Sequence, residues 1–276
     1  MNGTVIGLVL VAAALHATWN ALLRTGGDRL WSMTVMSAAT AVVALPVAIA
    51  APLPRPASWP FIALSSTLQV GYSLFLTAAY KTGGLAQVYP IARGSAPVLV
   101  TVAAFLLAGQ RPAPGALAGI ATIAAGMATL ALGRGRADRR SMLLALGTGC
   151  FIAAYTTSDG FGSRAAGNPL IYVAWIYAAY GSLMLAGHLA LRGKPTQPIW
   201  SAATGRAVIG GVLQLLAYGT VVAALSLGQF GSVAALRETG IIFAAMIGRV
   251  FLGETLPPRR LAACGLVALG AVLLAA

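Results

Sequence analysis

The sequence has few charged residues. Asp, Glu, Lys and Arg make up 8% of its 276 residues, and only 5 residues are acidic. Soluble domains carry about 25%, and no soluble core can absorb a chain that is 59% hydrophobic. The composition therefore excludes an ordinary soluble domain and predicts an all-α, polytopic membrane protein. Helices rather than a barrel are expected, because apolar runs of about 18 to 24 residues recur and none alternates with period two.

Residues that form disulfides, metal sites and catalytic sets are also scarce. The two cysteines, Cys150 and Cys264, both lie inside apolar runs, so we expect no disulfide framework. The chain has 2 histidines and no CxxC or HExxH spacing, so neither a metal site nor a cofactor is expected. It also lacks a Ser/His/Asp set, paired carboxylates and a phosphate-binding loop, which argues against an enzyme.

The net charge of +13 does not indicate nucleic-acid binding. The basic residues are scattered through short loops, with no basic patch and no interleaved aromatic residues. Their excess follows the odd-numbered apolar runs, above all at 134–140, which predicts that these loops are cytoplasmic and that both termini lie outside. Residues 1–3 contain no positive charge, so the first run is expected to be a retained span rather than a signal peptide.

Ten apolar runs are separated by short breaks that carry glycine, proline or charge. The expected spans are residues 3–23, 31–50, 60–79, 85–108, 114–132, 141–159, 170–191, 205–226, 229–251 and 259–276. The charged linker divides them five and five, which predicts two five-helix units, residues 1–133 and 141–276.

The two halves of the chain are related at an offset of 144 residues, which places Arg93 on Arg237. The same offset pairs Gly84 with Gly228, Gly109 with Gly253, Pro114 with Pro258, and Gly126 with Gly270. Because each unit has an odd number of spans, the second unit must enter the membrane from the opposite side. The sequence therefore predicts an inverted repeat around a central cavity, with the site near the membrane midplane between the units.

The run 85–108 contains residues that a lipid-facing helix avoids. Arg93 lies about 8 residues into it, or ~12 Å deep, close to the middle of the hydrocarbon layer. An arginine there costs at least ~3 kcal/mol unless it meets water, a partner or an anion. Tyr89 and Pro97 share its helical face, and Pro90 and Pro97 each remove a backbone donor. This face predicts a functional site, unless Arg93 only bridges to carbonyls or a carboxylate of a neighbouring helix.

Further polar residues inside the spans are expected to line the cavity. These candidates are His16, Trp19, Asn20, Gln69, Tyr72, Tyr155, Gln214 and Tyr218. Gln69 and Gln214 are related at an offset of 145, which favours cavity lining over simple packing. For His16 and Asn20, four residues apart, an interhelical hydrogen bond that only holds the bundle together is an equal alternative.

Acidic residues and clustered tyrosines give two further expectations. Glu238 is expected to be the only carboxylate deep in a span, where it either neutralises Arg93 or binds a substrate ammonium or a coupling proton. Asp159, at the end of its run, is expected to be solvated at the membrane interface. In the run 170–191, the aromatic residues are assigned to the interfacial belt or to packing; they are Tyr172, Trp175, Tyr177 and Tyr180.

Glycines recur in the runs 114–132 and 259–276. They are Gly115, Gly119, Gly126, Gly265 and Gly270. Their small size suits close helix contact, including the face of a weak homodimer, although a monomer is also possible.

The organisation and three motifs resemble the EamA branch of the drug/metabolite transporter (DMT) superfamily over the whole chain. The motifs are Leu-His-Ala-Thr-Trp-Asn-Ala-Leu-Leu at 15–23, Tyr-Pro-Ile-Ala-Arg-Gly at 89–94, and Phe-Leu-Gly-Glu at 251–254 before a double proline. YddG-type amino-acid exporters are the most similar in size and pattern. The resemblance implies a central cavity built from the first, third, fourth, sixth, eighth and ninth spans. The second and seventh spans would lie outside it, and the fifth and tenth at one side.

This chain departs from the branch at two points. Gln110 replaces the glutamate that Glu254 keeps at the end of the corresponding span. The first span also lacks the embedded glutamate of the superfamily's small multidrug exporters, which argues against proton-for-cation exchange.

These patterns predict a multi-pass protein of the bacterial inner membrane, with a small-molecule substrate and the lipid bilayer as its partners. It would export small zwitterionic metabolites, above all neutral or aromatic amino acids, by alternating access. Arg93 and Arg237 are candidates for the substrate carboxylate, and Glu238, the tyrosines and the glutamines for its ammonium. The expected hinges are Pro90, Pro97 and Gly240. The alternatives are an organic-anion or sugar-phosphate carrier, a membrane-embedded enzyme, and a non-transporting membrane subunit.

Overall fold

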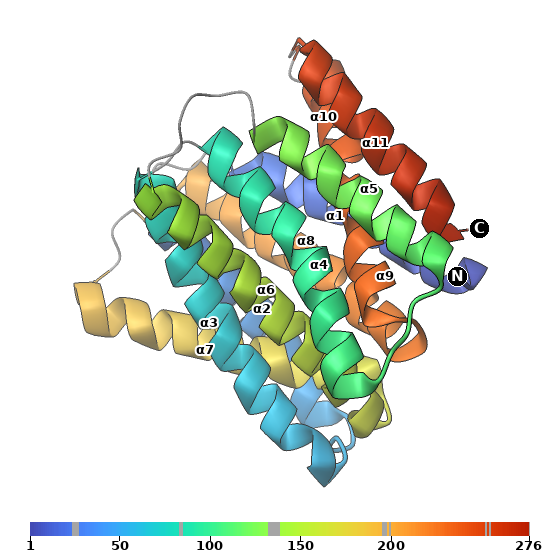
Figure 1. Ribbon diagram of the computed structural model, residues 1–276. Helices are drawn as coiled ribbons and strands as arrows, with labels where there is room; N and C mark the ends of the chain where they lie inside the picture. Colours follow the sequence, from blue (N-terminus) through green and yellow to red (C-terminus); the bar gives the residue numbers. More distant parts are fainter. Residues whose placement is uncertain are drawn as a thin grey trace.

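The computed structural model describes residues 1–23, 28–82, 85–131, 139–194, 198, 200–251, 253 and 255–275. Within these ranges the side chains of 21–23, 29, 80–82 and 85–89 are not described. Every regular element in the described ranges is a helix (Figure 1). The expected all-α fold is therefore confirmed.

Ten helical stretches are long and apolar enough to cross a membrane in the described part of the chain. Nine of them are α1 (Gly3–Leu23), α2 (Arg29–Ala50), α3 (Trp59–Thr82), α4 (Leu85–Ala108), α5 (Pro114–Ala131), α6 (Arg139–Ala166), α7 (Pro169–Arg192), α8 (Ala202–Leu227) and α11 (Pro258–Ala275). The remaining stretch consists of α9 (Phe230–Leu236), the 3-10 turn η2 (Arg237–Thr239) and α10 (Gly240–Phe251). A second 3-10 turn, η1 (Pro56–Ser58), precedes α3.

The observed helices match the expected spans to within a few residues at most ends, with one instructive exception. The sixth span was expected to end at 159, but α6 continues to Ala166. The added segment contains small and polar residues such as Gly160, Gly162 and Ser163, which lower its hydropathy. These residues are nevertheless buried against other helices. The helix is therefore extended by packing inside the protein rather than by apolar character.

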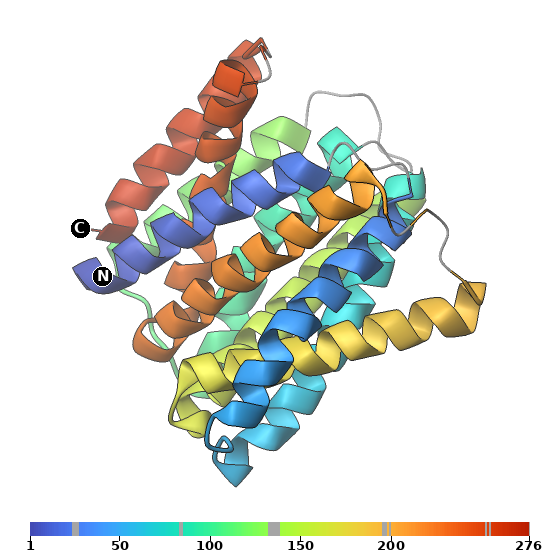
Figure 2. The same cartoon turned by 180° about the vertical axis from the view of Figure 1, so that it is seen from behind.

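Helices that are distant in sequence pack in pairs. α1 lies along α8, α2 along α7, α3 along α6 and α5 along α11 (Figures 1 and 2). If each helix is replaced by its counterpart in the other expected five-helix unit, the same four pairs result. A pseudo-twofold arrangement requires this. The unit boundaries at 1–133 and 141–276 remain a prediction.

The contact between α5 and α11 is reciprocal. A Cβ atom added to Gly270 would lie 2.6 Å from Ile123 Cγ1, and one added to Gly126 would lie 3.0 Å from Val267 Cγ2. The offset of 144 residues relates Gly126 to Gly270 and Ile123 to Val267, so each contact is the counterpart of the other. Glycine therefore allows two equivalent helices to approach closely.

These packing glycines bear on the expected homodimer face. Gly119, Gly126 and Gly270 are used inside one chain, whereas a Cβ added to Gly115 or Gly265 would meet nothing within 4 Å. A homodimer through α5 and α11 stays a prediction, and it would have to use the outer surfaces of these helices.

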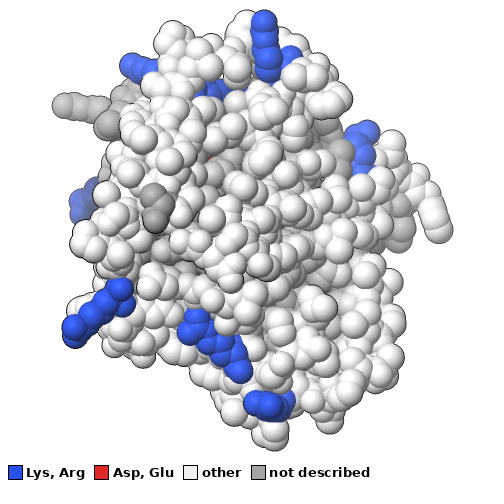
Figure 3. Space-filling model, turned by 90° about the vertical axis from the view of Figure 1, so that its right-hand side faces the viewer, with Lys and Arg blue, Asp and Glu red and all other residues white. Residues whose placement is uncertain are grey.

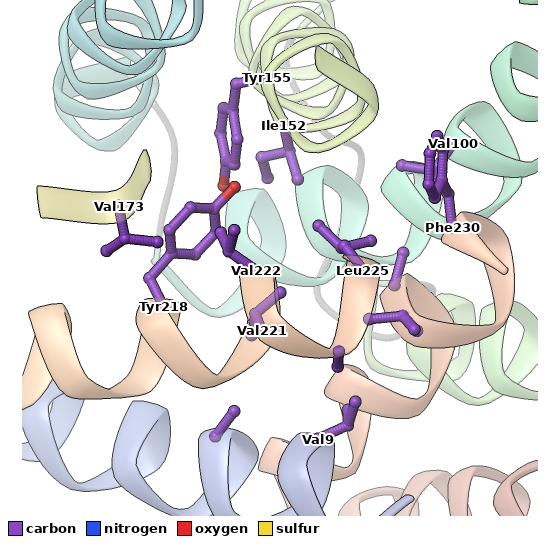
Figure 4. Packing of buried hydrophobic residues seen from close by; sticks show 14 of the residues in the cluster. Val9, Val100, Ile152, Tyr155, Val173, Tyr218, Val221, Val222, Leu225 and Phe230 are labelled. Atoms are coloured by element: carbon purple, nitrogen blue, oxygen red, sulfur yellow. The ribbon is translucent and has the colours of Figure 1, made fainter. Parts of the chain in front are cut away.

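The apolar core lies between the helices that approach the centre of the bundle. Val100 of α4, Ile152 of α6, Val222 and Leu225 of α8 and Phe230 of α9 are buried together (Figure 4). On the face shown in Figure 3, basic side chains are separated from one another and form no continuous patch. Cys150 and Cys264 are both free, as expected.

Candidate functional site

A cavity of about 40 Å³ lies where α1, α3, α4, α6, α7, α8 and η2 meet. The cavity therefore has room for at least one water molecule. The lining residues are Ala12, His16, Trp19, Gln69, Tyr72, Arg93, Tyr155, Tyr177, Tyr180, Gln214, Ala217, Tyr218, Val221 and Arg237. Most of the polar residues chosen from the sequence therefore meet in one place.

Three of the chosen residues need a separate account, because two do not line the cavity and the side chain of the other is not described. The side chain of Tyr89 lies outside the described residues. Asn20 Nδ2 donates a hydrogen bond to the carbonyl of His16 in its own helix, at 2.8 Å. This bond stays within one helix and uses one donor of the amide, so both alternatives given for Asn20 remain predictions. The third residue, Glu238, contacts Arg93 and does not line the cavity.

Arg93 and Glu238 form a buried ion pair between α4 and η2. Arg93 Nε donates to Glu238 Oε2 at 3.0 Å, and Arg93 Nη2 lies 2.9 Å from Glu238 Oε1. The two residues are 4% and 2% exposed. This confirms the alternative in which Glu238 neutralises Arg93. Two guanidinium nitrogens engage the carboxylate, so Glu238 is not available to an ammonium in this conformation.

Arg237 behaves differently from its neighbour in sequence. It lines the cavity and is 3% exposed, and its Nε and Nη2 atoms are buried without a hydrogen-bond partner among the described residues. Consecutive helical residues point about 100° apart, so Glu238 can face α4 while Arg237 faces the cavity. A buried cation without a partner is costly, and water or an anion in the cavity is expected to satisfy it.

The backbone of the ninth span is interrupted at these residues. α9 ends at Leu236, η2 holds Arg237 to Thr239, and α10 begins at Gly240. A Cβ atom added to Gly240 would lie 3.3 Å from the carbonyl oxygen of Ala13 in α1. A short 3-10 segment within a longer helix often marks a functional hinge. Pro90 and Pro97, by contrast, lie inside a continuous α4.

Five tyrosines form a continuous series of edge-to-face contacts along the cavity. Ring centroids are 5.8 Å apart for Tyr72–Tyr155 and Tyr155–Tyr218, and 6.0 Å apart for Tyr218–Tyr177 and Tyr177–Tyr180. Figure 4 shows the hydroxyl ends of Tyr155 and Tyr218 directed toward one another. The cavity therefore combines π faces with phenol hydroxyls.

Packing, one of the two roles expected for the aromatic residues of α7, is found for Tyr177 and Tyr180, but the implied position of the seventh span outside the cavity was wrong. Both are buried and line the cavity, so α7 contributes to the site instead of lying outside it. Their three-residue spacing, which places them on one helical face, was the signal available in the sequence. Tyr172 is also buried, at 0% exposure, and contacts Asp159.

The prediction for Asp159 was also wrong. Its side chain is 0% exposed because α6 continues beyond it and packs against other helices. Its Oδ1 atom accepts from the Tyr172 hydroxyl at 3.0 Å, and Oδ2 accepts from the Tyr218 hydroxyl at 2.5 Å. Glu238 is therefore not the only deeply buried carboxylate.

Gln110 has a local structural role that the sequence did not reveal. Its Oε1 atom accepts a hydrogen bond from the backbone N–H of Phe230, at the start of α9 (2.9 Å). Nearby, Arg164 donates to the carbonyls of Leu225 and Gly228, and its guanidinium lies 4.6 Å from the Phe230 ring centroid. These contacts hold the junction between α8 and α9 from two sides. Glu254, the counterpart of Gln110, lies outside the described residues.

Two comparisons with known proteins agree with this architecture. A solved structure, described only as the crystal structure of a protein, matches with a TM-score of 0.80 and 17% identity, over 99% of this chain and 96% of its own. At that identity the likeness concerns the fold alone. No curated protein matches. The family description "EamA-like transporter family" matches residues 139–276, which is half of the chain. The protein therefore belongs to the EamA-like transporter family of multi-pass membrane transporters.

Proposed function

We propose that this protein exports small zwitterionic metabolites, above all neutral or aromatic amino acids, across a bacterial inner membrane. The observation that carries the proposal is Arg237, a buried cation that faces the cavity with two unpartnered guanidinium nitrogens. A fork of N–H donors matches a carboxylate in two-point geometry. Arg237 is therefore our candidate for the substrate carboxylate. Arg93, which Glu238 already neutralises, serves as a structural neighbour.

The ammonium group of such a substrate would bind among the tyrosines. The rings of Tyr155, Tyr177 and Tyr218 surround part of the cavity, and a cation over an aromatic face is stabilised by about 0.5–2 kcal/mol. Gln69 and Gln214 add amide oxygens that accept hydrogen bonds. Apolar and aromatic walls suit the side chain of a neutral amino acid.

An organic-anion or sugar-phosphate carrier is the second candidate. A phosphate ester carries up to two negative charges and favours several cationic donors. Of the two arginines that line the cavity, Arg93 is already engaged by a carboxylate. One uncompensated cation therefore favours a substrate with a single carboxylate over a phosphate ester with two negative charges.

Transport would require alternating access, in which the cavity opens to each side of the membrane in turn. We propose that the ninth span bends at η2 and Gly240, and that α4 flexes at Pro90 and Pro97. The contacts of Gln110 and Arg164 at the junction between α8 and α9 would break and re-form in each cycle.

A ligand series that removes one charge at a time tests the substrate class. The melting temperature of the purified protein is measured with L-phenylalanine, with 2-phenylethylamine and with 3-phenylpropionate. Ligand at 100 times its Kd stabilises the native state by about 2.7 kcal/mol, so L-phenylalanine should raise the melting temperature and both analogues should fail. Stabilisation by glucose 6-phosphate, without any by amino acids, would replace this proposal with the second candidate.

A further inference from the structure

Asp159 is a buried carboxylate that the proposed substrate site does not use. In the part of the chain that the structure describes, no lysine, arginine or histidine forms an ion pair with it, unlike Glu238 with Arg93. Its oxygens instead accept hydrogen bonds from the hydroxyl groups of Tyr172 and Tyr218. Burying an ionised carboxylate without a cationic partner costs several kcal/mol. Asp159 is therefore a buried carboxyl group whose charge no basic side chain among the described residues balances in an ion pair.

One hydrogen-bonded route connects Asp159 to the cavity. Tyr218 lines the cavity and donates directly to Asp159 Oδ2 at 2.5 Å. Tyr172 reaches the same carboxyl group without lining the cavity.

Helices on several sides of Asp159 contribute the groups that act on its charge. α7 supplies Tyr172, α8 supplies Tyr218 and α6 itself supplies Tyr155 one turn earlier. η2 supplies Arg237, whose positive charge acts on Asp159. The adjacent charges of Arg93 and Glu238 cancel in their ion pair. An ammonium that enters among the tyrosines would be a new positive charge close to the carboxyl group.

We propose that Asp159 is a proton-binding site that exchanges its proton for the substrate's ammonium group, so that export is driven by inward proton movement. With the cavity empty of substrate, a hydronium ion in the cavity water gives its proton to the Tyr218 oxygen as the Tyr218 hydroxyl proton passes to Asp159 Oδ2, which leaves a water molecule and a neutral carboxyl group. Arrival of the ammonium stabilises the ionised carboxylate, and the proton returns to cavity water by the reverse transfers. The exchange rests on the proposed transport function, whereas proton binding by Asp159 does not.

Infrared spectroscopy of the purified, substrate-free protein tests proton binding by itself. Difference spectra between mildly acidic and mildly alkaline buffer should contain a carboxylic-acid C=O band that shifts on ¹³C-aspartate labelling and disappears in Asp159→Asn. The isotope experiment uses the wild-type chain, so it does not depend on how a variant folds. Absence of an aspartate band that changes with pH would overturn the proposal whether or not the protein transports amino acids.

Proteoliposomes that contain a pH-sensitive dye test the exchange. Flux of labelled L-phenylalanine should be accompanied by proton movement in the opposite direction, and an imposed pH gradient should change the flux several-fold. Asp159→Asn should lose the proton movement, and any flux that it keeps should no longer respond to the pH gradient. Tyr218→Phe should slow proton movement, whereas the matched Tyr172→Phe should preserve it. Wild-type flux without proton movement, or with protons moving in the same direction, would refute the exchange and leave the transport function intact.

Discussion

Two neighbouring residues in the ninth span have different electrostatic surroundings. Glu238 is directed to Arg93 of α4, and Arg237 to the cavity. The ion pair between Glu238 and Arg93 fixes the position of η2 against α4, whereas Arg237 leaves N–H donors for a ligand. Replacing both members of a buried ion pair by apolar residues changes stability little, whereas removing only one member is strongly destabilising.

Arg93→Ala should therefore destabilise the protein. The substitution leaves Glu238 buried without a cation, which costs about 3–5 kcal/mol, and a thermal melt in detergent should show a clear drop. Glu238→Ala should have a similar effect, and the double variant with two apolar residues should recover part of the loss.

The ion pair between Arg192 and Asp28 provides the matched control. Its side chains are 32% and 27% exposed, and exposed pairs contribute at most ~1 kcal/mol. Arg192→Ala should therefore melt close to the wild type. Equal losses for Arg93→Ala and Arg192→Ala would show that the buried pair has no special structural role.

At the scale of whole helices, the close contact between α5 and α11 depends on glycine. Gly270→Ala introduces a Cβ atom 2.6 Å from Ile123 and 2.7 Å from the Gly119 carbonyl oxygen, so the two helices must separate. Overpacking of this kind costs about 1–3 kcal/mol, which should lower the melting temperature.

Gly265→Ala on the same helix is the control, because nothing lies within 4 Å of its added Cβ atom. It should be neutral or slightly stabilising, since alanine favours a helix over glycine by up to about 1 kcal/mol. If both variants melt alike, the reciprocal contact does not contribute to stability.

The existence of the helices could be predicted from the sequence, but the orientation of several side chains could not. Apolar length alone indicates a span, so each helix was found. A helix with apolar residues on all sides has no clear amphipathic face, so the spacing of Tyr177 and Tyr180 in α7 indicated a shared face but not the direction in which that face points. The surroundings of Asp159 come from α7 and α8, which no local pattern in α6 records. Arg93 and Arg237 were found because charge inside an apolar run is conspicuous.

At the scale of the whole molecule, loop charge predicts the orientation in the membrane. Arg111 follows an even-numbered span and should lie outside, whereas Arg140 follows an odd-numbered span and should be cytoplasmic. Both side chains are exposed at the ends of the bundle. Arg111→Cys and Arg140→Cys, in a chain without Cys150 and Cys264, can be labelled in intact cells with a membrane-impermeant maleimide. Only Arg111→Cys should react, and the reverse pattern would place both termini in the cytoplasm.

The central claim is that Arg237 binds the carboxylate of a zwitterionic substrate inside the cavity. Flux of labelled L-phenylalanine from proteoliposomes, compared for the wild type, Arg237→Lys, Arg237→Ala and the surface variant Arg192→Ala, tests it most directly. Flux should be unchanged in Arg192→Ala, reduced in Arg237→Lys because one fork of donors is replaced by a single ammonium, and lost in Arg237→Ala. Wild-type flux in a folded Arg237→Ala protein would contradict the claim.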